Sequence, residues 1–310
     1  MTKILVTGAS GLLGLNFCLK AGVNHEVVGV VNKNLIRGIS FPIIRADLSK
    51  EKELDRVIEE SNPDLIIHCA AMANIDDCER DAGLARIVNA DMPGYLAKRT
   101  FQKGIRFVHI STDAIFDGTK EVYIENDTPN PLSVYAQTKW EGEQQVLEMN
   151  PDAIIARVNF YGWSLSGRRS LAEWFFNNLS AENPIKGFKD VNFCPLLVND
   201  LVDVLLKMDE KKLSGLFHVL SSECLSKYAF GVELARTFGF DEKLITPVSW
   251  EDGGLKAARS PNLNLSTKKL AIALGGELPD QRTGMGKFHQ QYTENFPKMM
   301  QSLGVRPNID

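Results

Sequence analysis

Short apolar runs alternate with longer amphipathic runs through the first half of the chain, and this alternation restricts the fold more than any other feature of the sequence. The expected strands are Ile4–Thr7, Glu26–Val31, Ile43–Ala46, Leu65–Cys69, Arg106–Ser111 and Ala153–Arg157. The expected helices between them are Leu12–Lys20, Lys50–Glu60, Leu84–Lys103 and Tyr135–Met149. Strands this apolar are typical of a parallel sheet that helices cover on both faces. The alternation therefore predicts an α/β fold with a doubly wound parallel sheet, the Rossmann arrangement.

The second half of the chain has a looser pattern. Helices are expected at Ser170–Leu179, Asp200–Met208, Lys227–Phe238 and Gly286–Leu303, with a strand at Leu216–Leu220. We expect residues 1–158 to form the domain of the sheet, with residues 196–220 returning to it. Residues 159–195 and 221–310 are then expected to form a smaller lobe at the carboxyl edge of the sheet.

Charge and cysteine content argue against several classes of protein. A net charge of -4 over 310 residues provides no basic field for nucleic acid or anionic membranes. No apolar run is long enough for a membrane span, and the first residues lead into a strand without a signal peptide core. The cysteines are Cys18, Cys69, Cys78, Cys194 and Cys224. Their odd number and scattered spacing favour free thiols in a reducing cytoplasm over disulfides or a zinc site.

Three glycines lie between the first expected strand and the first expected helix. Gly8 permits a tight turn, Gly11 lets the backbone approach a phosphate, and Gly14 allows the helix to pack closely on the strand. The helix N-terminus then offers N–H groups to a pyrophosphate. The stretch therefore predicts that residues 1–158 are a dinucleotide-binding domain, which leaves the smaller lobe to bind the substrate. Its GxxGxxG spacing differs from the GxGxxG of many dehydrogenases. The cofactor-binding residues expected here are Gly8, Ser10, Gly11, Leu12, Leu13 and Gly14.

Tyr135 and Lys139 are four residues apart, so on a helix their side chains point from the same face. A nearby cation lowers the pKa of a phenol, which makes tyrosine usable as a proton donor and acceptor. The spacing alone is common on helices. It gains weight because the predicted dinucleotide site lies upstream of it.

Further motifs extend along nearly the whole chain. Besides residues 7–14 they are Ala46-Asp47-Leu48, His68-Cys69-Ala70-Ala71, Val88-Asn89, residues 111–118, residues 135–143, Tyr161-Gly162, Asn199-Asp200-Leu201 and residues 259–265. Together they resemble the extended short-chain dehydrogenase/reductases, and specifically the dTDP-4-dehydrorhamnose reductase branch of the sugar-nucleotide reductases. The resemblance implies a Rossmann fold, a nicotinamide cofactor and a nucleotide-sugar substrate.

The resemblance also implies a catalytic set of Thr112, Tyr135 and Lys139. Tyr135 would donate a proton to the developing alkoxide, Lys139 would hold the nicotinamide ribose and lower the pKa of the phenol, and Thr112 would orient the carbonyl oxygen. For Thr112 taken alone, the alternative is a hydroxyl that caps a turn. The other implied cofactor contacts are Asp47 at the adenine, Leu48, Ala70, Ala71, and Asn89 near the Lys139 end, together with Tyr135 and Lys139 themselves.

The choice between NADP and NAD depends on the end of the second strand. An acidic residue at this place would bind the 2′-hydroxyl of NAD, and the sequence has none. Asn32, Lys33 and Arg37 instead offer neutral and positive groups that suit a 2′-phosphate. We therefore prefer NADP over NAD. The alternative is a solvated loop with ordinary charges.

Two departures from similar proteins narrow the chemistry. Related dehydratases carry Thr-Asp-Glu where this chain has Thr112-Asp113-Ala114, so elimination of water is not expected. The reductase branch commonly has a tyrosine in place of Ala114, so the substrate pocket differs. Some members use a glutamate just past the third glycine as a magnesium ligand. Leu15-Asn16 cannot do so, and we predict no metal there.

The substrate should bind to the second half of the chain. Phe160 and Arg259 are the expected substrate contacts. Trp163 and Trp174 fit a core cluster better than an aromatic wall at the substrate, and Arg168-Arg169 fit a phosphate contact and a solvated turn equally well. Residues 76–81 resemble a polar helix face, and we assign His68 and His109 no role.

The leading hypothesis is reduction of the 4-keto group of a nucleotide-activated 6-deoxysugar with NAD(P)H. One alternative is a sugar-nucleotide 4-epimerase. Another is a non-catalytic NADP-binding regulatory subunit resembling that of methionine adenosyltransferase. Similar proteins are often dimers, so we also expect a homodimer.

Overall fold

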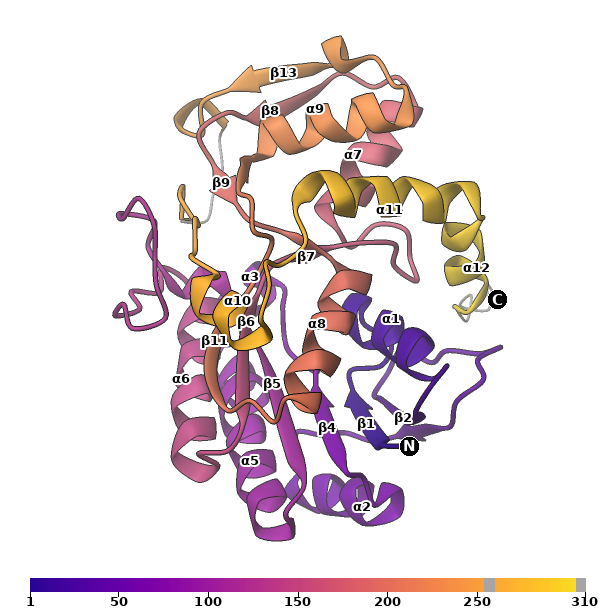
Figure 1. The fold of residues 1–310 in the computed structure, drawn as a ribbon, viewed down its shortest axis with the longest axis vertical. Coiled ribbons are helices and arrows are strands. Elements are labelled where there is room, and N and C mark those ends of the chain that lie inside the picture. The colour runs from indigo at the N-terminus through magenta and orange to yellow at the C-terminus, as the bar shows by residue number, and fades with distance from the viewer. Residues whose placement is uncertain (254–259, 305–310) are drawn as a thin grey trace.

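Seven parallel strands form the central sheet in a computed structural model of the chain, which describes residues 1–253 and 260–304 (Figure 1). The strands are β1 (Lys3–Thr7), β2 (Glu26–Val31), β3 (Ile43–Arg45), β4 (Leu65–His68), β5 (Arg106–Thr112), β6 (Ile154–Val158) and β11 (Gly215–Val219). Their order is β11-β6-β5-β4-β1-β2-β3, so the direction of winding reverses between β1 and β4. Ligands of such sheets bind at the carboxyl ends of the strands beside this reversal. The predicted doubly wound α/β fold is confirmed.

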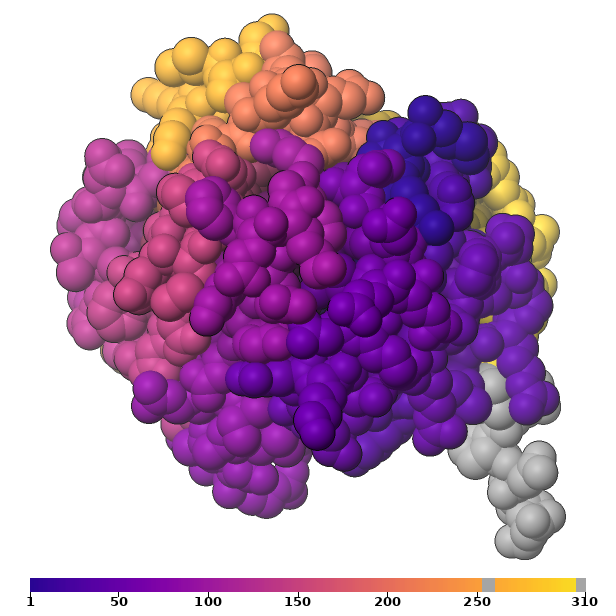
Figure 2. Space-filling view, turned by 90° about the horizontal axis from the view of Figure 1, so that it is seen from below, coloured from indigo at the N-terminus to yellow at the C-terminus, as the bar shows by residue number. Residues whose placement is uncertain are grey.

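Helices cover both faces of the sheet because alternate strand residues point to opposite sides. Ile4 and Val6 belong to a core cluster with α1 and α8, whereas Leu5 belongs to a second cluster with α2, α5 and α6. These helices are α1 (Leu12–Ala21), α2 (Glu51–Ser61), α5 (Met92–Lys103), α6 (Val134–Met149) and α8 (Val198–Glu210). Residues of the first half cover most of the face seen in Figure 2. Across residues 1–253 and 260–304, every helix is too short or too polar to span a lipid bilayer.

Two of the expected long helices are interrupted. The helix expected at Leu84–Lys103 is α4 (Ala82–Arg86), a π-helical turn η1 (Ile87–Asp91) and then α5, where Pro93 lies in the first turn. The helix expected at Gly286–Leu303 is α11 (Gln281–Thr293) followed by α12 (Phe296–Ser302). Asn295 between them has a left-handed backbone (φ 60°), which ends one helix and caps the next.

Most of the remaining elements of the second half form a lobe above the sheet, which Figure 1 shows around α7, α9 and α11. Besides α11, its elements are α7 (Leu171–Ser180), α9 (Lys227–Phe238) and three strand pairs: β7 (Phe160–Tyr161) with β10 (Leu196–Leu197), β8 (Ile185–Phe188) with β13 (Ile245–Val248), and β9 (Asn192–Phe193) with β12 (Leu225–Ser226). The helix α10 (Lys268–Leu274) lies outside the lobe and contacts β11. Shorter elements are α3 (Ile75–Arg80) and the 3-10 turns η2 (Asp113–Ile115), η3 (Glu242–Leu244) and η4 (Glu251–Gly253). Although β11 and α8 follow this lobe's first elements in sequence, β11 pairs with β6 and α8 packs against α1.

The two edges of the central sheet are short or occupied. β3 at one edge has only three residues. At the other edge, Lys269 Nζ donates to Leu216 O at 2.7 Å, and His218 N of β11 donates to Glu125 Oε1 at 3.1 Å. Side chains therefore bond backbone groups of β11 that a neighbouring strand would otherwise use.

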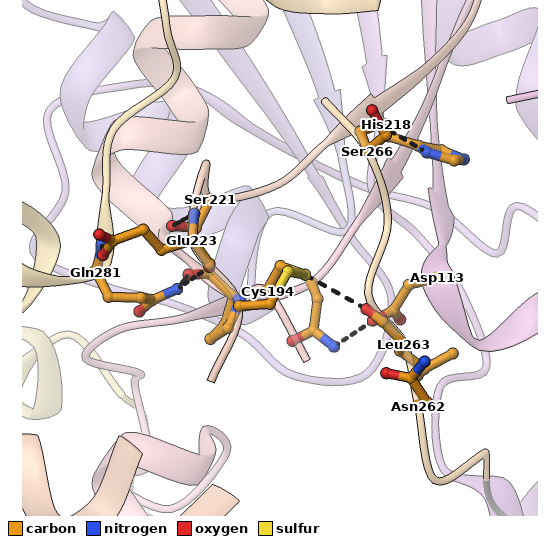
Figure 3. Close-up of a disulfide and its surroundings, with 12 residues drawn as sticks. Asp113, Cys194, His218, Ser221, Glu223, Asn262, Leu263, Ser266 and Gln281 are labelled. Carbon is orange, nitrogen blue, oxygen red and sulfur yellow. Dashed lines mark hydrogen bonds between the residues drawn. A yellow bond between two sulfur atoms is a disulfide. The ribbon is translucent and has the colours of Figure 1, made fainter. Parts of the chain in front are cut away.

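A disulfide joins Cys194 to Cys224, which corrects the expectation that all the cysteines are free thiols (Figure 3). The antiparallel pairing of β9 and β12 places Leu225 opposite Phe193, so the next residues along, Cys194 and Cys224, also face each other. Their Cα atoms are 4.1 Å apart. Thirty residues separate them in sequence, and only the strand register brings them together. Because two of the cysteines are not free thiols, the cysteines no longer argue for a reducing compartment. The cytoplasmic location stays a prediction.

Candidate active site

The glycine-rich turn after β1 leaves no room for a side chain at Gly8 or Gly14. Gly8 has φ 67°, and a Cβ atom there would lie 2.8 Å from Ala70 N. A Cβ atom on Gly14 would lie 2.3 Å from Gly8 O. Gly11 N donates to Gly8 O at 2.8 Å, and α1 begins at the next residue. Within the described residues no side chain caps this helix, so its first N–H groups face the space beyond the turn.

A cleft of about 870 Å³ opens in front of this turn. This volume lies in the usual range for pockets that bind small molecules and cofactors. The predicted residues that line it are Gly8, Ser10, Gly11, Leu12, Leu13, Gly14, Asn32, Lys33, Asp47, Leu48, Ala70, Ala71 and Phe160. Arg37, Asn89, Tyr135 and Lys139 are not among the lining residues. Bare glycines beside uncapped helix N–H groups suit the pyrophosphate of a dinucleotide.

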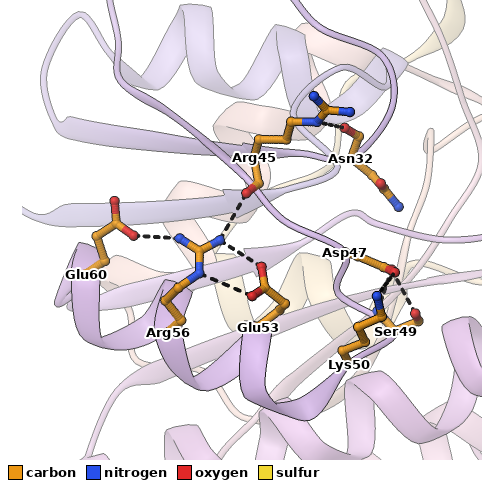
Figure 4. Close-up of polar contacts among 8 residues, drawn as sticks. All are labelled: Asn32, Arg45, Asp47, Ser49, Lys50, Glu53, Arg56 and Glu60. Atoms are coloured by element: carbon orange, nitrogen blue, oxygen red, sulfur yellow. Dashed lines mark hydrogen bonds and ion pairs between the residues drawn. The ribbon is translucent and has the colours of Figure 1, made fainter.

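The cleft ends beside β2, where Asn32, Lys33 and Asn34 line it. Arg45, which the sequence analysis missed, lies at the end of β3 and donates from Nε to Asn32 O at 3.3 Å (Figure 4). The sequence pattern did not reveal this placement, because it depends on the register of β2 and β3, which puts Arg45 opposite Val31. The predicted cation Arg37 instead lies on a segment whose backbone N donates to Leu303 O.

Asp47 lies on the neighbouring wall of the cleft. It accepts hydrogen bonds from Ser49 N at 3.3 Å and Ser49 Oγ at 2.7 Å, and pairs with Lys50 at 3.3 Å (Figure 4). The hydrogen bond from the Ser49 hydroxyl is the main reason why the pKa of Asp47 is lowered. The carboxylate is therefore ionised and fixed at the place where the adenine contact is predicted.

Thr112 and Tyr135 meet at the carboxyl end of β5. Tyr135 lies in the first turn of α6, which Ser133 caps by accepting a hydrogen bond from Ala136 N at 3.2 Å. Burial raises the pKa of the Tyr135 phenol to about 12, and a hydrogen bond with Thr112 partly opposes this rise. The shift is opposite to the lowering that the Tyr135/Lys139 spacing predicted, because burial outweighs any effect of the cation. The phenol is consequently protonated at neutral pH.

Lys139 is buried, and its ammonium group is bonded away from Tyr135. Nζ donates to Ile110 O at 2.6 Å and lies 3.3 Å from His109 Nε2. Burial lowers the pKa of Lys139 to about 8, while the charge of Glu143 opposes the change. The lysine therefore still carries a positive charge at neutral pH. Its ammonium group is bonded to Ile110, which lines the cleft.

His68 and His109, to which the sequence analysis assigned no role, stack on each other beside this lysine. Their ring centroids are 5.6 Å apart, because β4 and β5 place the two residues opposite each other. His68 Nδ1 is 2.8 Å from Thr7 Oγ1 in β1. Burial lowers the pKa of His68 to about 3 and moves that of His109 in the same direction. Both rings are neutral, so His109 can accept a hydrogen bond from Lys139.

Asn89 lies in the π-helical turn and holds the loop after β4. Its Nδ2 donates to Met72 O and to Thr138 Oγ1, each at 3.1 Å, and its Oδ1 accepts from Met72 N at 2.9 Å. Met72 lines the cleft, and Thr138 precedes Lys139. Asn89 therefore connects the wall of the cleft to α6 without contacting Lys139 itself.

A buried ion pair lies one helical turn beyond Lys139. Arg157 Nη2 is 2.8 Å from Glu143 Oε2, and both side chains are at most 2% exposed. Ser111 Oγ donates to Glu143 Oε1 at 2.5 Å, and Arg157 Nη1 is 3.5 Å from His218 Nε2. The pair thus connects α6, β5, β6 and β11 directly beneath the strand end that carries Thr112.

Asp113 is a buried carboxyl at the same strand end. Oδ2 accepts from Asn159 Nδ2 at 2.7 Å, and Oδ1 accepts from Thr112 Oγ1 at 3.3 Å. Burial raises the pKa of Asp113 to about 6, and these hydrogen bonds oppose the rise only in part. The following residue, Ala114, occupies η2 with a methyl group and offers no acid for an elimination.

Asp113→Asn should change how stability depends on pH. The folded-state pKa of about 6 lies above the ordinary value of 3.8, so the carboxyl's favourable contribution is complete below pH 4 and is lost as the pH rises through 6. The loss is about 3 kcal/mol at neutral pH. In urea unfolding, the free energy of unfolding of the variant should rise by about 2 kcal/mol relative to that of the wild type between pH 4.5 and 7.5. Parallel pH profiles for the two proteins would contradict this.

The second half of the chain supplies few of the predicted substrate contacts. Phe160 lines the cleft, but Arg259 lies outside the described residues. Trp163 is buried and stacks on Phe288 with centroids 4.1 Å apart, as expected of a core residue, and Trp174 is 42% exposed.

No metal centre is evident in the described part of the chain. In residues 1–253 and 260–304 there is no group of three or more His, Cys, Asp or Glu residues that could hold a metal ion. At the place where some similar proteins have a glutamate ligand, Asn16 donates its amide to Leu12 O at 2.8 Å and to Trp163 O at 3.1 Å.

Comparisons with known proteins agree with this geometry. The family model described as the RmlD substrate binding domain matches residues 1–294. The chain is 32% identical over 281 residues to the probable low-salt glycan biosynthesis reductase of Haloferax volcanii, covering 88% of this chain and 93% of that protein. It is 30% identical over 295 residues to the methionine adenosyltransferase 2 subunit beta of Pongo abelii, covering 89% and 84%.

A solved structure of similar sequence also carries the fold. The dTDP-4-dehydrorhamnose reductase of Bacillus anthracis in complex with NADP superposes with a TM-score of 0.80 at 25% identity, covering 94% of this chain and 99% of that one. The chain therefore belongs to the RmlD substrate binding domain family, whose fold and dinucleotide cleft are those of NAD(P)-dependent oxidoreductases of the extended short-chain dehydrogenase/reductase type.

Proposed function

We propose that the protein uses NADPH to reduce the 4-keto group of a nucleotide-activated 6-deoxysugar. The observation that carries this proposal is the position of Thr112 at the carboxyl end of β5, beside the helix α6 that carries Tyr135 in its first turn, next to the dinucleotide cleft. Two hydroxyl groups that converge on one point suit a carbonyl oxygen that becomes an alkoxide. Ala114 favours simple reduction, because the residue after Asp113 then supplies no second carboxyl group for an elimination.

The roles of the three residues follow from their protonation. A reduced nicotinamide bound in the cleft would supply a hydride to the carbonyl carbon. The neutral Tyr135 phenol donates its proton to the carbonyl oxygen, while Thr112 orients that oxygen through a hydrogen bond. Lys139 would favour the tyrosinate that remains through its positive charge and would hold the ribose, which requires its ammonium group to leave the bond that it makes with Ile110 O in this structure.

The preference for NADP rests on the polar end of the cleft beside β2. Asn32 and Lys33 line it, Arg45 lies next to Asn32, and residues 30–34, at the carboxyl end of β2 and in the turn after it, contain no carboxylate. A 2′-phosphate would meet two cations here. NADPH should therefore raise the melting temperature more than NADH at equal concentration.

Asn32→Asp should reverse this preference. A carboxylate at the end of β2 repels a 2′-phosphate and can accept a hydrogen bond from the 2′-hydroxyl of NADH. We expect NADPH affinity to fall about tenfold or more, with NADH affinity unchanged or higher. Nicotinamide fluorescence titration measures both. The control is Asn24→Asp, which adds the same charge in an exposed turn at the opposite ends of the strands. Equal losses in the two variants would refute the assignment.

A single assay tests the proposed reaction. The purified protein is incubated with NADPH and dTDP-4-keto-6-deoxysugars, and the nicotinamide absorbance is followed. Substrate-dependent oxidation of NADPH supports the reductase. A 4-epimerase would instead convert the sugar with tightly bound NAD and without external reductant.

The regulatory subunit is the second candidate, because the chain is 30% identical to the methionine adenosyltransferase 2 subunit beta over 295 residues. Tight binding of NADP without turnover of any sugar nucleotide, together with a stable complex with a methionine adenosyltransferase catalytic subunit, would favour it. The reductase assay and a pull-down with that subunit therefore separate the two candidates.

The proposed division of labour follows the two parts of the chain. Residues 1–158 with 196–220 bind the dinucleotide, and residues 159–195 and 221–310 bind the sugar nucleotide, with Phe160 at the border. A homodimer in the cytoplasm stays a prediction.

A further inference from the structure

We propose that Arg169, from the second lobe, binds the pyrophosphate of the dinucleotide. This inference rests on the proposed function only in requiring that NADP(H) occupies the cleft. It adds to the glycine-rich turn a cationic contact from the opposite wall. Arg169 lines the cleft together with Gly11, Leu12 and Leu13.

The backbone that carries Arg169 is fixed by a buried carboxylate. Glu173 is fully buried and accepts hydrogen bonds from Arg169 N at 2.8 Å, Ser170 N at 3.1 Å and Ser164 N at 2.6 Å. Ser164 Oγ adds a fourth bond at 2.9 Å. Four donors around one buried carboxylate hold residues 164–170 in a single conformation. The loop is therefore a rigid base for the arginine side chain.

The same loop is hydrogen-bonded to the N-terminal part of α1. Asn16 Nδ2 donates to Trp163 O at 3.1 Å, and Ser170 Oγ donates to Gly162 O at 2.8 Å. A Cβ atom on Gly162 would lie 3.8 Å from Leu12 Cδ1. Residues 162–170 thus extend from the helix start that faces the pyrophosphate, and Arg169 enters the cleft from this side.

The glycine-rich turn carries no positive side chain that could neutralise a bound pyrophosphate. The turn of residues 7–14 contains no lysine or arginine, so it offers a doubly charged pyrophosphate only backbone N–H groups. Within residues 1–253 and 260–304, the Arg169 guanidinium has no ion pair. Arginine is suited to phosphate oxygens because its planar donors bind them in pairs. Arg168, its neighbour, is also exposed but does not line the cleft.

The test compares Arg169→Ala with the matched control Arg168→Ala in full-length protein. NADPH and NADH are titrated by nicotinamide fluorescence, and each apo protein's melting temperature is measured. We expect Arg169→Ala to weaken NADPH and NADH binding by a similar factor, about tenfold or more, because both contain the pyrophosphate. Arg168→Ala should stay within about twofold of the wild type. Arg169→Lys should recover part of the loss, and Arg169→Gln repeats the test if the alanine variant folds poorly.

A probe without a pyrophosphate sharpens the result. Adenosine 2′-monophosphate contains the 2′-phosphate and the adenine, so its binding should be the same in Arg169→Ala and the wild type. Equal NADPH affinity in the Arg169 and Arg168 variants would overturn the proposal. A loss for NADPH and adenosine 2′-monophosphate but not for NADH would also overturn it, because Arg169 would then bind the 2′-phosphate. These binding measurements do not depend on turnover of a sugar, so failure of the reductase assay is distinguishable from failure here.

Discussion

Tyr135→Phe is expected to lower kcat of the proposed reduction by about 10²- to 10⁴-fold, because it removes the proton donor and retains the ring. The phenol is protonated at neutral pH, since burial raises its pKa to about 12. The phenol therefore carries the proton that reduction of a carbonyl group requires. Steady-state oxidation of NADPH with a 4-keto sugar nucleotide measures the loss, and NADPH affinity should change little.

A second tyrosine provides the control for this substitution. Tyr95 on α5 donates its hydroxyl to Asp55 of the neighbouring helix α2 at 2.9 Å. Tyr95→Phe removes the same atom from a residue that does not line the cleft and should leave kcat near the wild-type value. If Tyr135→Phe retains more than about a tenth of wild-type kcat, another group donates the proton.

Glu143→Leu is expected to lower the free energy of unfolding by about 3–5 kcal/mol. The substitution leaves Arg157, which is 2% exposed, without its partner carboxylate. A loss of this size is a large part of the about 5–15 kcal/mol that stabilises a typical domain. Urea unfolding measures the change.

Two further variants separate the charge effect from a general packing defect. Arg157→Met alone should be similarly destabilising, because it leaves Glu143 buried and unpaired. The double variant Glu143→Leu/Arg157→Met should recover most of the loss, since neither charge is then stranded. Glu242→Gln breaks the exposed pair with Arg236 and should have little effect. Additive losses in the double variant would contradict the interpretation as an ion pair.

Local patterns were sufficient to predict the sheet and the glycine-rich turn. The strands are apolar on both faces, and Gly8 and Gly14 stand where a Cβ atom would collide with backbone, so each feature is encoded within a few residues. Contacts set by the pairing of distant strands were not predictable in this way. The Cys194–Cys224 disulfide, the placement of Arg45 beside Asn32, and the stacking of His68 on His109 all depend on strand register.

The pKa of Tyr135 was mispredicted for a related reason. An i,i+4 spacing places two side chains on one face of a helix, but it does not say which other groups they reach. Lys139 Nζ bonds to Ile110 O, and burial dominates the phenol. The break between α11 and α12 likewise depends on the left-handed backbone of Asn295, which the sequence pattern did not reveal.

The occupied edges of the central sheet restrict how two copies of this chain can associate. Because Lys269 and Glu125 already bond backbone groups of β11, and β3 offers only three residues, continuing the sheet with strands of a partner is unfavourable at either edge. A homodimer should therefore bury helical surfaces. For the same reason the folded chain should resist the edge-to-edge pairing that starts aggregation in open sheets.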